Sequence, residues 1–202
     1  MAQIQHDTSF SGTGAFRQAF ANLLGCPPHK LDKKGVLLAD WITTPLGDMI
    51  AVSSIQHLHL LEFIDRKALP TELTKLRKAC NNDLGVGSFG PTEQIRSELS
   101  AFFSGKSARF RAPLSLQGSA FTKEVWNELR AIPAGQTRSY SEIAKRVNRP
   151  SAVRAVARAN GANQIAIVIP CHRVIGADGS LTGYGGGLWR KQRLIEIEQA
   201  FV

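Results

Sequence analysis

The chain has 202 residues, 43% of them apolar, which is enough for one or two globular domains with a substantial core. It contains no run of about 18 uncharged apolar residues, as a membrane span requires, and its first residues lack the basic-then-apolar pattern of a secretory signal. The net charge of +9 is concentrated in residues 116–202, which contain 12 basic and 6 acidic residues. This excess predicts a polyanionic partner, with nucleic acid as the first candidate, and the alternative is a protein that is merely soluble and basic.

One helix is predicted within residues 1–31, over the stretch "GAFRQAFANLLG". Phe16 and Phe20 fall at helical spacing, and Gly25 followed by two prolines ends the pattern. A single helix is too short to form a core of its own.

Residues 35–115 have an α+β pattern. The segment "ADWITTPLGDMIAVSSIQHLHLLEFI" predicts strands separated by turns at 45–47 and near 53–56, and "TEQIRSELSAFFSGK" predicts a helix with one apolar face. The stretch "NNDLGVGSFGP" between them is expected to be a loop. His57 and His59 alternate with leucines as strand residues do, so we expect sheet or surface positions for them and not a ligand site.

The last part of the chain, from residue 118, predicts two helices joined by a tight turn. "FTKEVWNELRAI" is an amphipathic helix that precedes this pair. "SYSEIAKRVN" opens with a capping box formed by Ser139 and Glu142, and "RPSAVRAVARANG" follows, with Ser151 as its expected N-cap and Gly161 as its stop. Together they form a helix-turn-helix pattern.

The second helix of this pair carries Arg154 and Arg158 one turn apart, on an edge that we expect to be exposed. Small residues stand around the two arginines and would allow close approach to another surface: Ala152, Ala155 and Ala159. The opposite face is expected to pack inward through three apolar residues: Val153, Val156 and Ala157. A solvated arginine face is the alternative, but together with the charge excess the pattern favours binding to nucleic acid.

A thiol stands beside an imidazole in the stretch "QIAIVIPCHRVIG". The apolar run 165–169 predicts a buried strand that ends at a proline and presents Cys171 and His172. An imidazole that accepts the thiol proton makes a nucleophile near neutral pH, although buried cysteines are often only small apolar residues. Three carboxylates are near enough in sequence to orient the imidazole: Asp178, Glu196 and Glu198. Glu198 is favoured because it lies next to the apolar face of the closing helix "LWRKQRLIEIEQA".

The other cysteines predict neither a disulfide framework nor a metal site. Cys26, Cys80 and Cys171 are odd in number and widely scattered, which indicates a reducing cytoplasm. No Cys-x-x-Cys pair occurs, and Cys26 with His29 supplies only half of a metal site. We therefore expect no metal and no cofactor.

The stretch "IPCHRVIG" resembles the active-site signature of the O6-alkylguanine-DNA alkyltransferases, also called methylated-DNA–protein-cysteine methyltransferases. "GSAFTKEVWNELRAIPAGQTRSYSEIA", "SAVRAVARANGANQIAIVIPCHRV" and "TGYGGGLWRKQRLIEIE" follow that family in order and spacing, and "TTPLGDMIAVSS" resembles its opening hairpin. The resemblance implies an α+β domain over 32–115, with a small antiparallel sheet that is ribonuclease H-like. It implies a mostly helical, winged-helix-like domain with the helix-turn-helix over 116–202.

The resemblance also implies a chemistry. Cys171 would take the alkyl group from O6 of guanine in DNA, less well from O4 of thymine, and keep it as a thioether after one turnover. His172 would be its base through a bound water, with Glu198 orienting the imidazole. Asn163 would tie the recognition helix to the active-site strand, and Tyr140 would hydrogen-bond the guanine so that it leaves as a neutral species. No cofactor is implied.

The implied partner is double-stranded DNA, approached through its minor groove by a monomer in the bacterial cytoplasm, with no membrane involved. Arg154 would fill the gap left by a flipped nucleotide. The other expected DNA contacts are Ala152, Ala155, Arg158, Ser139 and Arg173. The expected pocket residues are Tyr184, Gly185 and Val174, with some relatives carrying serine at the position of Gly185.

Residues 1–31 lie outside this resemblance. "SFSGTGAFRQAFANLLGCPPHKLDK" resembles the last part of an AraC-type DNA-binding domain, whose first helices are missing here, so a remnant is predicted and a plain docking helix is the alternative. Three other functions compete for the whole chain: an alkylated-DNA-binding protein that does not repair, an adaptive-response transcription regulator, and a Cys-His hydrolase. The presence of Cys171, the truncated N-terminal motif and the lack of further hydrolase signals argue against them in turn.

Overall fold

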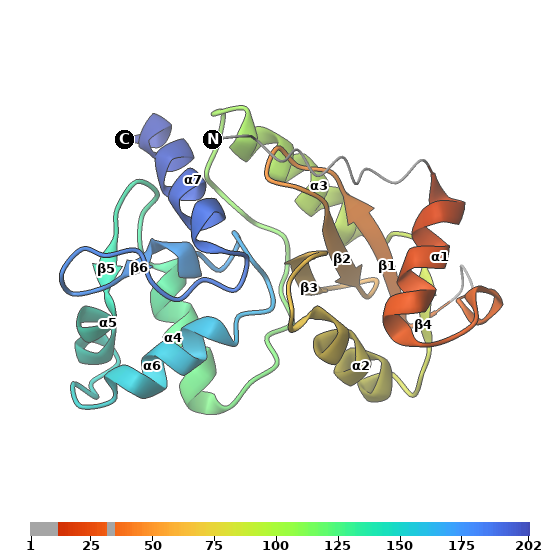
Figure 1. Ribbon diagram of the computed structural model, residues 1–202, viewed down its shortest axis with the longest axis horizontal. Coiled ribbons are helices and arrows are strands. Elements are labelled where there is room, and N and C mark those ends of the chain that lie inside the picture. Colours follow the sequence, from red (N-terminus) through yellow and green to blue (C-terminus); the bar gives the residue numbers. More distant parts are fainter. Residues whose placement is uncertain (1–11, 32–34) are drawn as a thin grey trace.

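The protein is described by a computed structural model that covers residues 12–31 and 35–202 (Figure 1). A sheet with its helices forms the N-terminal half, and a group of helices forms the C-terminal half beside it. The first residues of the chain, on which the expectation of no secretory signal depends, lie outside the described residues. So does the expected boundary at residue 32.

Four strands form the sheet of the N-terminal half, in the order β3-β2-β1-β4. They are β1 (Leu37–Ile42), β2 (Met49–Ser53), β3 (Leu58–Phe63) and β4 (Leu84–Val86). The first three are antiparallel neighbours, as predicted, but β4 runs parallel to β1. The sheet is therefore mixed, and the expectation of an antiparallel sheet is wrong at this edge.

The edge strand β4 lies in the stretch predicted to be a loop. Leu84 pairs with Leu37, and Val86 pairs with Ala39. A strand of three residues with a central glycine is too short to show alternation, so its formation depends on the neighbouring β1 and not on its own sequence.

The helix α2 (Leu69–Ala79) connects β3 to this edge and was not predicted. Leu69, Leu73 and Leu76 are buried at a spacing of four and three residues. This spacing is a helical signal, and Pro70 in the first turn is compatible with a helix start.

Successive side chains of a strand point to opposite faces of the sheet, and both faces of this sheet are covered by other elements. Ile50, Val52 and Leu60 pack in one cluster with residues of α1 and α2. Met49 and Ala51 pack in the other cluster, with α3 (Gly90–Phe103) and the C-terminal half. The predicted helix α3 is thus confirmed, and its apolar face is buried.

The predicted N-terminal helix is α1 (Thr13–Leu24), followed by a short 3-10 turn, η1 (Pro28–Lys30). Gly25 ends α1 in the left-handed conformation, with φ of 60°. Phe16 and Phe20 are fully buried, and the ring centroid of Phe16 lies 5.1 Å from that of Trp41 on β1. The helix is therefore docked on the sheet, as the docking alternative expects.

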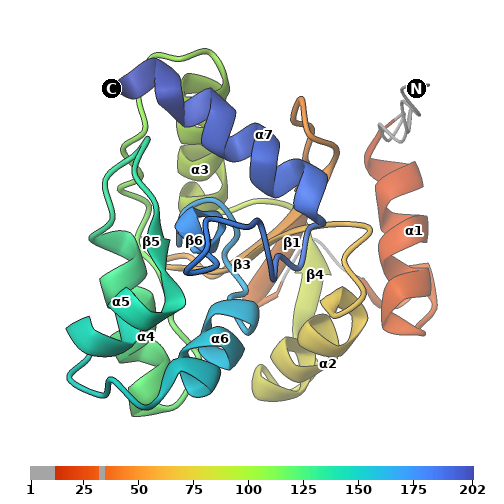
Figure 2. The same ribbon diagram turned by 60° about the vertical axis from the view of Figure 1, so that its left-hand side comes forward.

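The C-terminal half contains four α-helices, two short 3-10 turns and one pair of two-residue strands. They are α4 (Ala120–Arg130), β5 (Arg138–Ser139), α5 (Tyr140–Arg146), α6 (Val153–Gly161), η2 (Cys171–Arg173), β6 (Val174–Ile175), α7 (Leu188–Glu198) and η3 (Gln199–Phe201). Figure 2 shows α4, α5 and α6 grouped together, with α7 crossing above them toward the sheet. None of the helices in the described ranges is long and apolar enough to span a bilayer.

The predicted pair of helices joined by a turn is formed by α5 and α6. The capping box at the start of α5 is present, with the Ser139 hydroxyl accepting from the Glu142 backbone N–H and the Glu142 carboxylate accepting from Ser139 N–H. The expected N-cap of α6 is wrong: the helix begins after Ala152, whose carbonyl accepts from Val156 N–H at 2.9 Å. Ser151 is left in the preceding turn. The turn starts at Asn148, which has φ of 55°, and it extends to Ala152 instead of ending at Ser151.

The apolar run before Cys171 is not a strand. Its residues are buried, but the segment forms a turn in which Ile169 N–H donates to the Ile165 carbonyl at 3.0 Å and Ile167 has φ of 71°. Only one bridge joins it to the sheet, between Ile165 and Leu61 of β3. Because Ala166 N–H also donates to the Leu61 carbonyl at 2.8 Å, the turn that leads to the thiol is fixed to the outer edge of β3, away from β2. The thiol therefore lies at the junction of the two halves.

Candidate active site

Cys171 is the first residue of η2, and its side chain is held by the turn that precedes it. The thiol is 7% exposed, and Asn163 Nδ2 donates to Sγ at 3.1 Å. The same Nδ2 donates to the Ile169 carbonyl at 2.8 Å, and Asn163 Oδ1 accepts from Ile165 N–H at 2.9 Å. One amide side chain therefore fixes both the turn and the thiol.

His172 and Glu198 meet in the interior, as the position of Glu198 beside the apolar face of α7 suggested. His172 Nε2 lies 2.8 Å from Glu198 Oε1, and both side chains are buried. The other two carboxylates considered from the sequence, Asp178 and Glu196, are exposed. The structure thus selects Glu198 as the partner of the imidazole.

His172 is not the only group that donates a hydrogen bond to Glu198 among the described residues. Arg173 donates to it through Nε at 2.8 Å and through Nη2 at 2.7 Å, and Gly135 N–H donates at 3.3 Å. Burial alone would raise the pKa of Glu198, but the bonds and charges of His172 and Arg173 outweigh burial and hold that pKa at about 2. The carboxylate is therefore ionised at any ordinary pH.

The ionised carboxylate determines the tautomer of His172. A carboxylate only accepts, so Nε2 carries the hydrogen and Nδ1 is left as an acceptor. Nδ1 is buried and makes no hydrogen bond within the described residues. Burial lowers the pKa of His172, against the effect of Glu198, so the resting imidazole is neutral and able to take a proton at Nδ1.

The thiol is protonated in this resting arrangement. Burial raises the pKa of Cys171 to about 11, although the bond from Asn163 and the charges of Arg66 and Lys191 act in the opposite direction. A nucleophilic sulfur at neutral pH therefore requires that the proton be removed during the reaction.

Arg173 does not lie where a DNA-contacting residue would. Its guanidinium is buried, paired with Glu198 and bonded to the Ile132 carbonyl. The sequence interpretation of Arg173 as a DNA contact is therefore wrong. The charge next to His172 is needed inside the protein to keep Glu198 ionised.

A small pocket lies in front of the thiol. It is lined by Asn160, Gly161 and Asn163 at the end of α6, by Cys171, by the loop 183–186, and by Glu62, Arg66 and Ala166. Tyr184 and Gly185 are in this lining, as predicted, but Val174 is not, because its side chain is buried behind η2. The free volume of the pocket is about 10 Å³, about enough for one water molecule.

One tyrosine, Tyr184, lines this pocket, and a second, Tyr140, contacts the loop that carries it. Tyr140 donates weakly to the carbonyls of Thr182 at 3.4 Å and Gly183 at 3.5 Å, and so closes the loop onto α5. The Tyr184 ring stands edge-on to His172 with centroids 6.4 Å apart. Burial raises the pKa of Tyr184 well above its ordinary value, so its hydroxyl stays protonated.

Three charged residues near the thiol were not predicted from the sequence. Glu62 and Arg66 come from the N-terminal half and line the pocket. Lys191 is fully buried and bonds the carbonyls of Val174 and Thr182, while burial lowers its pKa to about 8. The available signal for Glu62 was a carboxylate between leucine and phenylalanine in the strand "LHLLEF".

The surface of α6 agrees with the sequence pattern in its arginines and differs in its alanines. Arg154 and Arg158 are exposed, and Ala152 and Ala155 are half-buried. The inward face consists of Val156, Ala159 and Asn160, so the expected inward position of Ala157 is wrong and so is the outward position of Ala159. Trp126 of α4 donates to the Ala159 carbonyl at 2.8 Å, which holds this side of α6 against α4. Ser139, another expected DNA contact, is occupied by the capping box.

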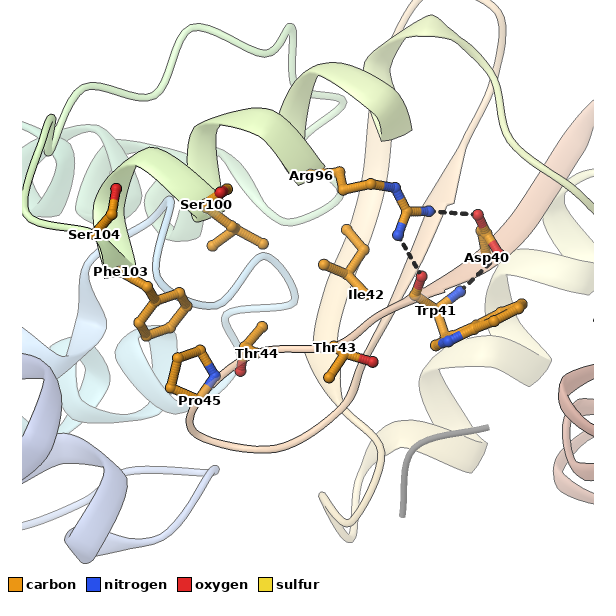
Figure 3. A pocket seen from close by; sticks show the side chains of 11 residues that line it. Asp40, Trp41, Ile42, Thr43, Thr44, Pro45, Arg96, Ser100, Phe103 and Ser104 are labelled. Atoms are coloured by element: carbon orange, nitrogen blue, oxygen red, sulfur yellow. Dashed lines mark hydrogen bonds and ion pairs between the residues drawn. The ribbon is translucent and has the colours of Figure 1, made fainter. Parts of the chain in front are cut away.

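A wider hollow of about 570 Å³ lies between the turn after β1 and α3, and it differs chemically from the thiol site (Figure 3). Arg96 projects into it and is paired with Asp40, and it also donates to the Trp41 carbonyl at 3.0 Å. No cysteine or histidine lines this hollow. Within residues 12–31 and 35–202, no three His, Cys, Asp or Glu side chains are grouped so that they could hold a metal ion.

Comparison with known proteins supports the interpretation of the thiol site. The family model for the DNA-binding domain of 6-O-methylguanine DNA methyltransferase matches residues 120–200. A methylated-DNA–protein-cysteine methyltransferase of Mycolicibacterium paratuberculosis is 57% identical over 102 residues, which are 50% of this chain and 62% of that protein. The chain thus spans about three fifths of that relative. The protein of the same name from Mycobacterium leprae is 42% identical over 156 residues, 77% of this chain and 88% of that protein.

Solved structures extend the likeness to both halves. The crystal structure of Mycobacterium tuberculosis O6-methylguanine methyltransferase has a TM-score of 0.70 at 38% identity and covers 82% of this chain and 94% of that chain. A structure of Mycobacterium tuberculosis OGT in complex with DNA has a TM-score of 0.69 at 38% identity, covering 79% of this chain and 91% of that chain. The resemblance of residues 1–31 to the end of an AraC-type domain stays a prediction. With a buried Cys171 that is held by Asn163 and followed by the His172–Glu198 pair, the chain belongs to the family of methylated-DNA–protein-cysteine methyltransferases.

Proposed function

We propose that this protein repairs alkylated DNA by transferring the alkyl group from O6 of guanine, and less well from O4 of thymine, to Cys171. The proposal rests on one observation: a buried thiol accepts a hydrogen bond from Asn163 and is followed in the chain by the His172–Glu198 pair. Membership in the methyltransferase family and the likeness to a relative solved with DNA support it. Each molecule reacts once, because the thioether that forms has no evident route back to the thiol.

The groups that donate and accept protons in the site are suited to this transfer. The thiol proton passes to Nδ1 of His172, through one water, while Nε2 keeps its bond to Glu198. Sulfur then attacks the alkyl carbon, a C–S bond forms and the bond between that carbon and O6 breaks. The departing guanine gains a proton and leaves neutral, and we assign this assistance to the hydroxyl of Tyr140. No metal or cofactor takes part in these steps.

The substrate base must enter a pocket that is almost closed at rest. A purine does not fit into about 10 Å³, so the loop that carries Tyr184 and Gly185 has to move outward. The weak bonds from Tyr140 to the Thr182 and Gly183 carbonyls are the ones to be exchanged for bonds to the base. Glycines at 183, 185, 186 and 187 give this loop the freedom to do so.

The DNA is held by α6, whose exposed Arg154 enters the minor groove and occupies the gap left by the flipped nucleotide. Arg158 on the same edge contacts the backbone, and the half-buried Ala152 and Ala155 allow the close approach. Because the minor groove distinguishes sequences poorly, this mode suits a protein that must act at any sequence. The protein acts as a monomer in the bacterial cytoplasm, and its two halves have the ribonuclease H-like and winged-helix-like folds of the family.

The experiment that tests this proposal follows a labelled methyl group from DNA to the protein. A duplex with O6-methylguanine labelled in the methyl group is incubated with the protein, and the peptide containing Cys171 is weighed. We expect one methyl group on Cys171 for each molecule, and no transfer by Cys171→Ala, which still binds the duplex. Many turnovers, or label released as methanol, would indicate a hydrolase, and binding without transfer by the unaltered protein would indicate a damage-binding protein.

A further inference from the structure

Glu62 and Arg66 of the N-terminal half both line the active-site pocket, and Arg66 also bonds the backbone of the C-terminal half. Arg66 lies in the turn after β3, where its N–H donates to the Phe63 carbonyl at 3.1 Å. Its guanidinium is almost fully buried and donates to two backbone carbonyls of the other half, from Nη2 to Gly161 at 2.9 Å and from Nη1 to Asn163 at 2.6 Å. These carbonyls stand at the end of α6 and at the start of the turn that leads to Cys171.

Two carboxylates hold Arg66 in this position. Glu62 forms a buried ion pair with Nη1, and Glu72 Oε1 lies 3.3 Å from Nη2. Glu62 is itself fixed, because it accepts from Phe63 N–H at 3.0 Å. An arginine with both ends of its planar fork bonded in the interior cannot swing away without leaving buried charges unpaired.

The remaining edge of the guanidinium faces the wall of the pocket at Gly185. A Cβ atom at Gly185 would lie 2.8 Å from Arg66 Nε, closer than Cβ atoms approach other atoms in proteins, and 3.3 Å from Cζ, a tight contact. The backbone does not demand glycine here, because Gly185 is not among the residues with positive φ, whereas Gly183 and Gly187 have φ of 60° and 91°. What excludes a side chain at this position is therefore the fixed guanidinium.

We propose that Arg66 is a positioning residue for alkyl transfer, which holds the end of α6 and Asn163 in register around the thiol and sets how closely the loop at Gly185 can approach. This proposal rests on the proposed function. The Asn163 carbonyl bonds Arg66 while the Asn163 side chain bonds Cys171 Sγ, so a shift of that peptide moves the thiol. Through the Gly161 carbonyl, the same guanidinium also fixes the helix that carries Arg154. The N-terminal half thus contributes to the reaction by holding these parts of the C-terminal half in place.

The test is a double-substitution cycle with Arg66→Ala and Gly185→Ala, measured as the rate of transfer from free O6-benzylguanine, which needs no flipping. Gly185→Ala alone is expected to slow transfer about tenfold or more, and Arg66→Ala by about 10- to 100-fold, since a displacement of about 1 Å costs about that much. In the Arg66→Ala background, the Gly185→Ala substitution is expected to change the rate less than about twofold, because the clash is gone. Equal costs of Gly185→Ala in both backgrounds would overturn the proposal, as would an Arg66→Ala protein that is as fast as the unaltered one.

Two matched controls separate positioning from general stability. Arg96→Ala removes another paired arginine of the N-terminal half and should leave the cost of Gly185→Ala unchanged. Gly90→Ala adds a methyl group where no atom lies within 4 Å and should leave the rate unchanged. If Arg66→Ala does not fold, Arg66→Lys replaces it. This variant keeps the charge but cannot bond both carbonyls, so Gly185→Ala should cost clearly less in this background, and an unchanged cost would count against the proposal.

The proposal and the proposed function fail in different ways. If the unaltered protein and Gly90→Ala both transfer no alkyl group from DNA or from the free base, the proposed function is wrong. If both transfer normally and the cycle shows no coupling between residues 66 and 185, only the role of Arg66 is wrong.

Discussion

Replacing Glu198 by glutamine removes one charge from the interior and changes the hydrogen-bonding character of one position. The carboxylate accepts from His172, twice from Arg173 and once from Gly135, and it donates to none of them. A glutamine offers one acceptor oxygen and places an NH2 group against these donors. Glu198→Gln therefore leaves the buried guanidinium of Arg173 without a counter-charge.

The magnitude follows from the pKa of Glu198, which lies at about 2 instead of 4.5. At about 1.4 kcal/mol for each pH unit, this difference corresponds to about 3 kcal/mol of stability. Loss of one partner from a buried ion pair costs about 3–5 kcal/mol, so both routes agree. Because the pKa is lowered on folding, this stability is fully present above about pH 4.5 and is lost as the pH falls toward 2.

Unfolding in urea at several pH values measures this effect. At pH 7 we expect Glu198→Gln to be less stable by about 3 kcal/mol, and the difference from the unaltered protein to shrink between pH 4.5 and pH 2. Glu196→Gln is the matched control on the same helix: its carboxylate is exposed and pairs with Arg193, so its loss costs at most about 1 kcal/mol.

Alkyl transfer supplies the second readout for Glu198→Gln. Without the carboxylate the proton of His172 is no longer held on Nε2, so we expect transfer from duplex DNA and from free O6-benzylguanine to slow together by about 100-fold. If stability at pH 7 changed by less than about 1 kcal/mol and both rates stayed within twofold, Glu198 would neither be ionised in the folded protein nor orient His172.

One further substitution tests the proposed DNA-binding surface, and one truncation tests the N-terminal helix. Arg154→Ala should slow repair in duplex DNA about 100-fold, while attack on free O6-benzylguanine stays within twofold, because flipping costs a few kcal/mol and chemistry does not use this side chain; equal losses on both substrates would contradict that role. A truncated variant that begins at Lys34 should keep its transfer rate within a few-fold. Uncovering the surface under Phe16 and Phe20 should lower its stability by about 3–6 kcal/mol and its melting temperature by roughly 10 °C. A melting temperature that does not change would mean that the helix is loosely attached, and loss of transfer by a folded truncated variant would mean that it helps to hold DNA.

Local signals in the sequence determined most of the helices and the chemistry of the thiol. The capping box of Ser139 and Glu142 and the left-handed stop at Gly25 use atoms within a few residues of each other, so the sequence alone specifies them. The order Pro-Cys-His-Arg likewise carried the family resemblance, and the position of Glu198 beside the apolar face of the closing helix favoured it as the partner of His172.

Only the tertiary structure decided the features that depend on residues far apart in the chain. β4 exists because β1 offers it a partner, and the apolar run before Cys171 becomes a turn because Asn163 and the edge of β3 take up its backbone groups. Neither pairing leaves a periodic pattern in the sequence.

The same holds for the charges around the thiol. Arg173 has the residue type of a DNA contact, but Glu198, which lies 25 residues away, draws it into the interior. Arg66 reaches the carbonyl of Asn163 across 97 residues. A charged side chain is buried only where a distant partner compensates its lost hydration. Its burial is therefore a property of the folded chain, and its own neighbourhood in the sequence does not reveal it.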